Sequence, residues 1–144
     1  MYKNILLAVD LNEESSWAKA LPTTVEYCKA FKSELHLMTV VPDFGMNVVR
    51  SFFPDDFADQ AVAETRKALD SLAGKSIPDG IPVSTFVGYG SIYEEILSAA
   101  KKMNADLIIM ASHGPHAKDY LLGPNAARVV RHADCSVLVV RNQA

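Results

Sequence analysis

The chain alternates short, continuously apolar runs with longer segments in which apolar residues recur every three to four positions. The apolar runs have the pattern of parallel strands that are covered on both faces, and they occupy residues 5–9, 35–41, 82–87, 107–111 and 137–140. The periodic segments predict amphipathic helices over residues 12–32, 55–73, 91–103 and 125–132. A strand followed by a helix, repeated, predicts an open parallel sheet with helices on both faces. We therefore expect one α/β domain over residues 1–144.

Local signals refine two of these helices. Asn12 is a candidate N-cap for the first helix, and Pro22 predicts a bend or break near Ala18 because proline removes a hydrogen bond within a helix. Ser91 and Glu94 match a capping box, in which the two side chains satisfy backbone donors at the start of a helix. Residues 43–54 give no clear pattern and remain without a prediction.

Composition and charge limit the possible partners. The net charge of −3 and the pI of about 5.7 argue against a nucleic-acid-binding protein, which usually carries a basic stripe. No apolar run reaches the length of a membrane span, and we expect no signal peptide because strand-like sequence begins at Ile5. Cys28 and Cys135 are far apart and form no disulfide or metal-binding pattern. These features predict a cytoplasmic protein, and we expect both cysteines to serve in packing.

The stretch from Met110 to Asn125 carries the candidate chemistry. It follows a buried strand, contains Gly114 and Gly123, and leads through Pro124 into a helix. The first turn of a helix has free N–H groups and a partial positive charge, which suit a phosphate. In a sheet of strand order 3-2-1-4-5, ligands bind beyond the carboxyl ends of strands one and four. We therefore predict a nucleotide site in that crevice, between the turn at Asp10 and this loop.

Four stretches give the chain a family resemblance that extends over essentially its whole length. They are YKNILLAVD, LHLMTVVP, DLIIMASHG and LLGPNAARVVRHADCSVLVVR. With these, the chain resembles the universal stress proteins, and in particular their short F/G-type members. The resemblance implies a five-stranded Rossmann-like fold, of the adenine nucleotide alpha hydrolase-like kind, and a homodimer. In one branch of the family it also implies bound ATP.

The resemblance also implies a set of nucleotide-binding positions. Carried over residue by residue, these are Ala8, Val9, Asp10, Val40, Met110, Ala111, Ser112, His113, Gly114, Gly123, Pro124 and Asn125. Of these, Ala8 and Asp10 would meet the adenine and ribose, and Val40 would pack on the base. Met110 and Ala111 would border the base and sugar, and the positions from Gly114 onward would line the phosphates.

The loop departs from the pattern of the nucleotide-binding branch at three points. Ala111 replaces the first glycine, eight residues rather than nine separate Gly114 from Gly123, and Pro124 replaces a serine or threonine. Proline removes both a hydroxyl group and a backbone donor, and each lost charge-assisted hydrogen bond costs about 1.5–3 kcal/mol. The side-chain amide of Asn125 is a candidate substitute for the missing serine.

Other types of site find less support. His113 and His116, with Asp119 nearby, lack a fourth ligand for a metal site. Asp10 lacks the additional acidic residues that a phosphoacceptor aspartate requires. Ser112 is adjacent to a histidine, but no aspartate is placed to orient that histidine as in a hydrolase triad.

We therefore predict a stress-responsive regulator that binds ATP, with or without Mg²⁺, and forms a homodimer through the last strand, 137–140. No general base for hydrolysis stands out, so we expect no catalytic residues and no dedicated enzyme. We also expect no nucleic-acid or membrane partner. Two alternatives remain open: a dimeric interaction module with a degenerate nucleotide site, and a slow ATPase.

Overall fold

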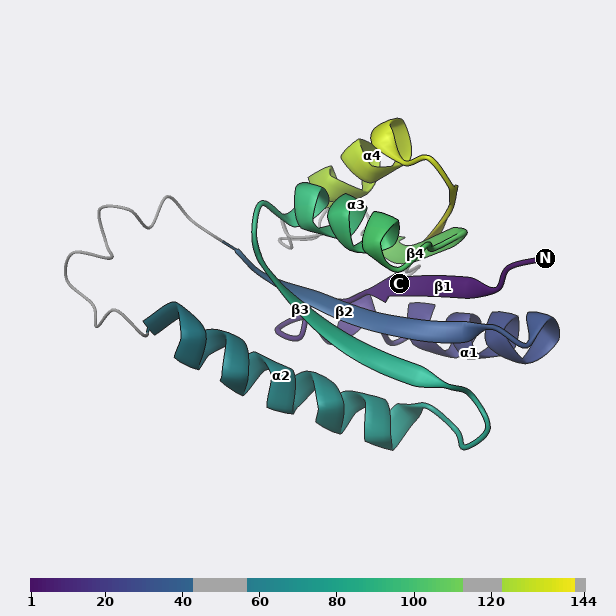
Figure 1. The fold of residues 1–144 in the computed structure, drawn as a ribbon, viewed down its shortest axis with the longest axis horizontal. Coiled ribbons are helices and arrows are strands. Elements are labelled where there is room, and N and C mark those ends of the chain that lie inside the picture. The colour runs from purple at the N-terminus through teal and green to yellow at the C-terminus, as the bar shows by residue number, and fades with distance from the viewer. Residues whose placement is uncertain (43–56, 113–122, 142–144) are drawn as a thin grey trace.

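The five strands form one parallel sheet in the order β3-β2-β1-β4-β5, as predicted (Figure 1). The computed structural model describes residues 1–42, 57–112 and 123–141. The strands are β1 (Asn4–Ala8), β2 (Glu34–Pro42), β3 (Val83–Gly90), β4 (Leu107–Ser112) and β5 (Ser136–Arg141). The helices are the short 3-10 helix η1 (Glu14–Ser16) and the α-helices α1 (Ala20–Phe31), α2 (Phe57–Ser76), α3 (Ile92–Lys102) and α4 (Gly123–His132). The segment 43–54 and the predicted site residues His113 and Gly114 lie outside the described residues.

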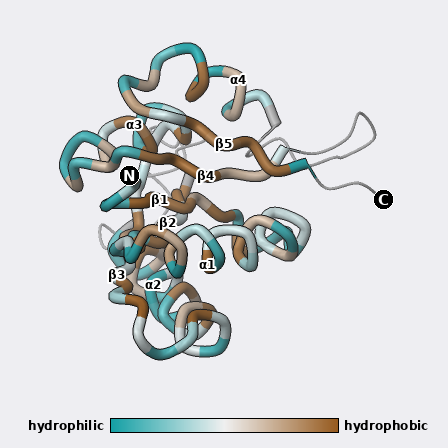
Figure 2. Tube along the Cα trace, turned by 90° about the vertical axis from the view of Figure 1, so that its right-hand side faces the viewer, coloured by the Kyte–Doolittle hydropathy of each residue, from teal (hydrophilic) through white to brown (hydrophobic). Residues whose placement is uncertain are grey.

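Continuous apolar sequence places β1 and β4 at the centre of the sheet. Leu6, Leu7, Ile108 and Ile109 are all fully buried. Side chains of successive strand residues point to opposite faces, so one buried run supplies apolar side chains to both layers. Figure 2 shows hydrophobic colouring along these strands and β5, with helices of mixed polarity on either side. The predicted Rossmann-like arrangement, with helices on both faces, is confirmed.

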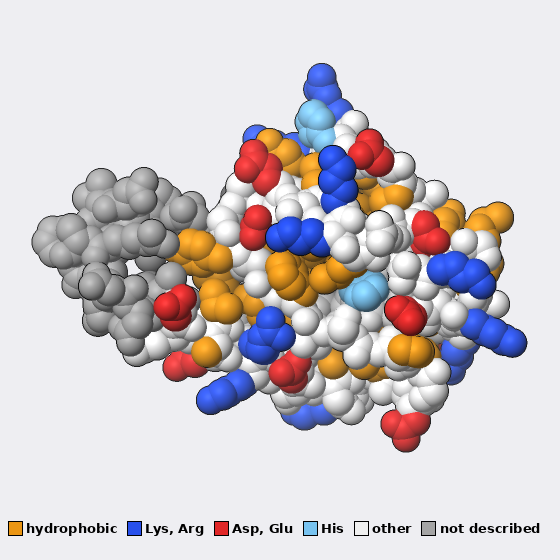
Figure 3. Space-filling view, in the orientation of Figure 1, with side chains coloured by type: hydrophobic (Ala, Val, Ile, Leu, Met, Phe, Trp, Pro, Cys, Tyr) orange, Lys and Arg blue, Asp and Glu red, His pale blue; other side chains and the backbone are white. Residues whose placement is uncertain are grey.

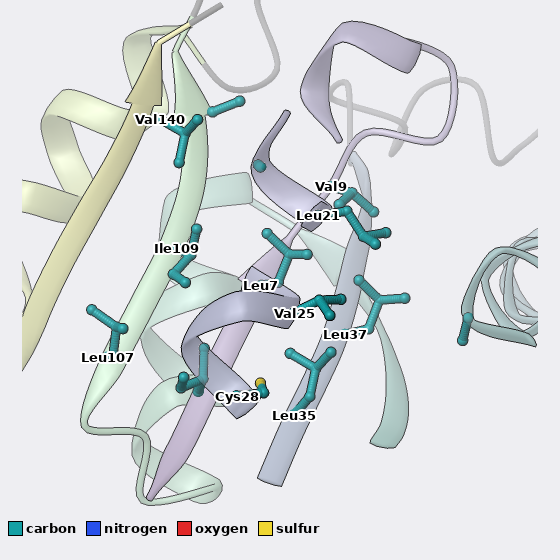
Figure 4. Close-up of a cluster of buried hydrophobic side chains, with 14 of the residues drawn as sticks. Leu7, Val9, Leu21, Val25, Cys28, Leu35, Leu37, Leu107, Ile109 and Val140 are labelled. Atoms are coloured by element: carbon teal, nitrogen blue, oxygen red, sulfur yellow. The ribbon is translucent and has the colours of Figure 1, made fainter. Parts of the chain in front are cut away.

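Each face of the sheet has its own core. The face covered by α1 and α2 contains Leu7, Leu37 and Ile109 in neighbouring register, and Leu21, Val25 and Cys28 of α1 point onto it (Figure 4). The opposite face is covered by α3 and α4, and its buried members include Leu6, Ala8, Met38, Ile96, Ile108, Met110 and Val129. The sheet is therefore covered on both sides, and ligands can approach it most readily at its ends.

The first α-helix begins later than predicted. Asn12 is not its N-cap; the chain instead makes a turn and the η1 helix, and α1 begins at Ala20. The reason is local: the Ser16 hydroxyl accepts the Asp10 N–H at 2.8 Å and donates to the Asp10 C=O at 2.9 Å, which closes a loop at the end of β1. The break expected near Ala18 therefore lies before α1. Pro22 falls in the first turn of α1, where a missing N–H is tolerated.

The predicted capping box does not form. Ser91 occupies the N-cap position of α3, but its side chain makes no capping hydrogen bond. Instead, the side-chain oxygen of Asn125, from α4, accepts the Tyr93 N–H at 3.2 Å. The cap at the start of α3 therefore comes from Asn125, which is distant in sequence, and not from the side chain of Ser91.

The remaining elements agree with prediction, with small shifts at their ends. β3 continues to Gly90 because β2 extends to Pro42 and the two strands remain paired. α2 continues through Gly74 to Ser76, and α4 begins at Gly123 rather than at Asn125. In the part of the chain that the structure describes, no helix has both the length and the apolar character needed to cross a bilayer.

Candidate functional site

A narrow cavity lies at the carboxyl ends of β1 and β2, next to the first turns of α3. Its lining residues are Ala8, Val9, Asp10, Thr39, Val40, Ile92 and Ile96. The cavity volume is about 10 Å³, which is room for roughly one water molecule. Four residues of the predicted nucleotide site, from β2, the end of β1 and the turn after β1, therefore gather around one cavity. It adjoins the carboxyl ends of the strands, where ligands bind in folds of this type.

Asp10 is held rigidly at this cavity. Only 5% of the residue surface is exposed, and its Oδ1 accepts the Asn12 N–H at 3.0 Å. Its own backbone groups bond to the Ser16 hydroxyl, and its C=O also accepts the Glu13 N–H at 3.0 Å. Among the lining residues, Asp10 contributes the one carboxylate. An aspartate fixed in this way can accept a hydrogen bond from a ligand hydroxyl without losing side-chain entropy.

The walls of the cavity are mainly apolar. Ala8 is buried and faces the α3 and α4 layer, and Val40 lies on the same face of the sheet, partly exposed. Ile92 and Ile96 close the cavity from α3. An apolar slot with one fixed acceptor at its end has the chemistry that suits a flat base and an attached sugar.

The predicted residues of β4 lie differently. Met110 and Ala111 are both fully buried, on opposite faces of the sheet, and neither lines the cavity. Met110 is in register with Ala8, so the carboxyl ends of β4 and β1 are adjacent. Ser112 is partly buried at the end of β4, opposite Arg141 of β5. The side chains of Met110 and Ala111 thus contribute to the core on either side of the crevice.

The first turn of α4 is connected to the first turn of α3. Pro124 is exposed, whereas only 8% of the Asn125 surface is exposed, and its side-chain oxygen bonds to Tyr93. The guanidinium of Arg128 lies over the Tyr93 ring, 5.3 Å from its centroid, and the His132 ring is 6.1 Å from that of Tyr93. The side-chain oxygen of Asn125 therefore caps α3, and contact of its side-chain amide with a phosphate stays a prediction.

Three lining residues were absent from the sequence prediction of the site: Thr39, Ile92 and Ile96. The spacing of Ile92 and Ile96, one helical turn apart directly after β3, is the signal that could have identified two of them. Thr39 had no comparable signal, because its neighbours in the strand are apolar on both sides.

Neither cysteine is placed as a reactive group. Burial raises the pKa of the Cys28 thiol to about 11. The pKa of Cys135 is also raised, first by burial and then by the negative charges of Asp106 and Asp134. Both thiols are therefore protonated near neutral pH, and the protonated form is a poor nucleophile. Within the described ranges, no cluster of three or more histidine, cysteine or acidic side chains is arranged to hold a metal ion.

Comparison with known proteins identifies the class to which this fold and cavity belong. The sequence model of the universal stress protein family matches residues 1–141, and the chain belongs to that family. Universal stress protein G of Escherichia coli O157:H7 is 30% identical over 143 residues, which covers 98% of this chain and 100% of the relative. Universal stress protein C of Escherichia coli O6:H1 is 31% identical over 141 residues, or 96% of this chain and 95% of the relative.

Solved structures agree with this assignment. The hypothetical protein MJ0577 has a TM-score of 0.75 at 27% identity, and the match covers 100% of this chain and 99% of the MJ0577 chain. A universal stress protein family member from Burkholderia pseudomallei has a TM-score of 0.71 at 26% identity, with 96% of each chain covered. The predicted family and fold are therefore both confirmed.

Proposed function

We propose that this protein binds an adenine nucleotide, ATP with or without Mg²⁺, with its base in the cavity beside β1 and β2 and the rest of the ligand along the crevice between β1 and β4. The observation that carries the proposal is the cavity at the ends of β1 and β2, where Ala8, Asp10 and Val40 meet. Other members of this fold group have been solved with nucleotides: a universal stress protein in complex with cAMP and one from Archaeoglobus fulgidus in complex with dAMP. Both are less than 20% identical to this chain, so they support the proposal through the fold alone.

Different residues contact different parts of the ligand. The base packs against Val40 and the apolar wall of α3, and the ribose hydroxyls donate to Asp10. The phosphates lie near the first turn of α4, whose free N–H groups and partial positive charge favour anions. Magnesium, when present, is held mainly by the phosphates and water. The cavity has room for only about one water molecule, so binding of a nucleotide requires its lining residues to move apart.

We propose binding rather than catalysis as the main activity. Among the residues that line the cavity, the one carboxylate is Asp10, and the proposal places it at the ribose, away from the terminal phosphate. Hydrolysis requires a base within reach of a water molecule beside that phosphate. The expected role is that of a stress-responsive regulator in the cytoplasm. The names of the relatives support the link to stress.

We further propose a homodimer formed through β5. This strand is at one edge of the sheet, and its residues Val137, Leu138 and Val139 are partly exposed. An apolar edge strand tends to pair with another strand unless it is covered. Pairing with a second copy across a two-fold axis covers both edges at once.

A second candidate function is a dimeric interaction module whose nucleotide site has degenerated. The narrowness of the cavity and the position of Pro124 at the start of α4 favour this candidate. The two functions differ in whether ATP binds at all. A slow ATPase, the third alternative from the sequence, requires turnover in addition to binding.

Replacement of Pro124 by serine tests the phosphate end of the proposed site. Pro124→Ser restores a hydroxyl and a backbone donor in the first turn of α4, so its affinity for Mg-ATP should rise about tenfold to a hundredfold. Isothermal titration calorimetry of both proteins measures the change. Pro78→Ser, at an exposed proline before β3, is the matched control and should leave the affinity unchanged.

The possible outcomes separate the candidates. Equal ATP affinity in the wild type and in Pro124→Ser would mean that the phosphates do not lie at the first turn of α4. If neither protein binds ATP, the interaction module is the better account.

A further inference from the structure

The two edge strands of the sheet, β3 and β5, have different surroundings. β3 forms the edge opposite β5 and lies between α2 and α3 (Figure 1). It is eight residues long, and 40% of the surface of Val83, its first residue, is exposed. A strand of this length at an open edge presents a row of unpaired backbone groups that can template the addition of another strand. Whether β3 accepts a second molecule depends on what occupies those groups.

The hydrogen bonding of β2 identifies which groups of β3 point outward. The Leu35 N–H donates to the Pro82 C=O at 2.8 Å, with Leu35 in register with Val83. In a parallel pair, backbone groups of successive residues point alternately toward and away from the neighbouring strand. The even-numbered residues of this stretch therefore bond to β2. The backbone N–H and C=O groups of Val83, Thr85, Val87 and Tyr89 point to the outer edge.

Charged side chains from both helices occupy this outer edge. Glu95 of α3 accepts the outward Tyr89 N–H at 3.0 Å. From the other face of the sheet, Arg66 of α2 donates to the outward Thr85 C=O at the long distance of 3.5 Å. The Thr85 hydroxyl donates to Asp70, one turn further along α2, at 2.5 Å. The edge of β3 is thus held by ionic groups from α2 on one side and α3 on the other.

Glu95 also fits closely against the backbone of β3. A side chain added at Gly88 would place its Cβ 3.1 Å from Glu95 Oε1 and 3.2 Å from Glu95 Cβ. These distances are tighter than nine in ten real Cβ contacts, so a glycine at this position lets the glutamate lie over the strand. Figure 3 shows basic and acidic side chains interspersed over this face of the molecule.

We propose that Glu95 and Arg66 close the β3 edge to strand addition, so that a second copy of this chain can pair only at β5. A molecule with two open edges could pair head to tail and grow into an unlimited array, whereas a molecule with one open edge stops at a closed dimer. Burying a glutamate or arginine in a new strand interface without a partner is costly. The placement of charges at an edge strand is a common means of preventing such growth. The inference uses the proposed dimer only to name the edge that remains open.

The test compares the size of two double variants with that of the wild type. Arg66→Ala/Glu95→Ala removes both edge groups. Lys67→Ala/Glu94→Ala removes the same number and sign of charges from exposed neighbouring positions on the same two helices and is the matched control. Sedimentation velocity is measured over a range of concentrations, with circular dichroism to verify folding. For Arg66→Ala/Glu95→Ala we expect species that are at least about twofold larger than the largest wild-type species, and no change for the control.

Each outcome decides the proposal. A folded Arg66→Ala/Glu95→Ala protein with the wild-type size distribution would overturn it, and so would equal growth of the control. If the double variant does not fold, Glu95→Ala alone is measured, because it removes the carboxylate that accepts the Tyr89 N–H; growth supports the proposal, and wild-type size overturns it. Titration of the same proteins with Mg-ATP keeps the two proposals separate. Retained ATP binding with unchanged size leaves the nucleotide site standing and removes only the closed edge.

Discussion

Replacement of Leu7 by alanine should lower the free energy of unfolding by about 2–5 kcal/mol. Leu7 is fully buried in the central strand β1, in register with Leu37 on one side and Ile109 on the other. Truncation removes apolar surface from the core beneath α1 and leaves a cavity that the flanking strands cannot fill. Domains are typically stable by only about 5–15 kcal/mol, so this one change removes a large part of the total. Urea denaturation followed by circular dichroism measures the loss.

The matched control for this prediction is Val130→Ala. Val130 is on α4, 53% of its residue surface is exposed, and its truncation should change the free energy of unfolding by less than about 0.5 kcal/mol. A Leu7→Ala protein that is as stable as Val130→Ala would contradict the description of β1 as the centre of the core.

Replacement of Asp10 by asparagine should weaken the binding of Mg-ATP by about tenfold to a hundredfold. The amide retains an oxygen that can accept the Asn12 N–H, so the turn after β1 is preserved. The charge that strengthens a hydrogen bond from a ribose hydroxyl is lost, and such bonds contribute about 1.5–3 kcal/mol. Calorimetric titration measures the affinity, and the melting temperature without ligand shows whether the fold is retained.

Asp79→Asn provides the comparison for this experiment. Asp79 is exposed in the turn that leads into β3, far from the carboxyl ends of the strands, and its replacement removes the same charge. Its affinity for ATP should equal that of the wild type. If the two variants bind ATP equally well, Asp10 does not contact the ribose.

The sequence predicted the sheet more accurately than the ends of the helices. Strands buried on both faces, such as β1 and β4, are apolar throughout, so their pattern depends little on which partner each residue meets. The start of α1 depends instead on a specific contact between Ser16 and the backbone of Asp10. The N-cap of α3 depends on Asn125, which lies 32 positions away from Tyr93. Local propensity does not contain contacts of this kind.

In the candidate site, too, some features follow from the local sequence and others depend on contacts with distant elements. Ala8, Asp10 and Val40 follow from strand ends and from the family resemblance, and they do line one cavity. Met110 and Ala111 follow from the same reasoning, but their side chains are turned into the two cores. The narrowness of the cavity was not predictable, because it is set by the packing of Ile92 and Ile96 from a separate helix.

The central claim, that this protein binds an adenine nucleotide, is tested most directly on gently purified wild-type protein. The protein is denatured, and the released small molecules are identified by mass spectrometry and quantified by chromatography. The proposal predicts ATP or another adenine nucleotide at close to one per subunit. If no nucleotide is released, and millimolar Mg-ATP added to the folded protein gives no thermal shift, the claim is contradicted and the interaction module is the function to pursue.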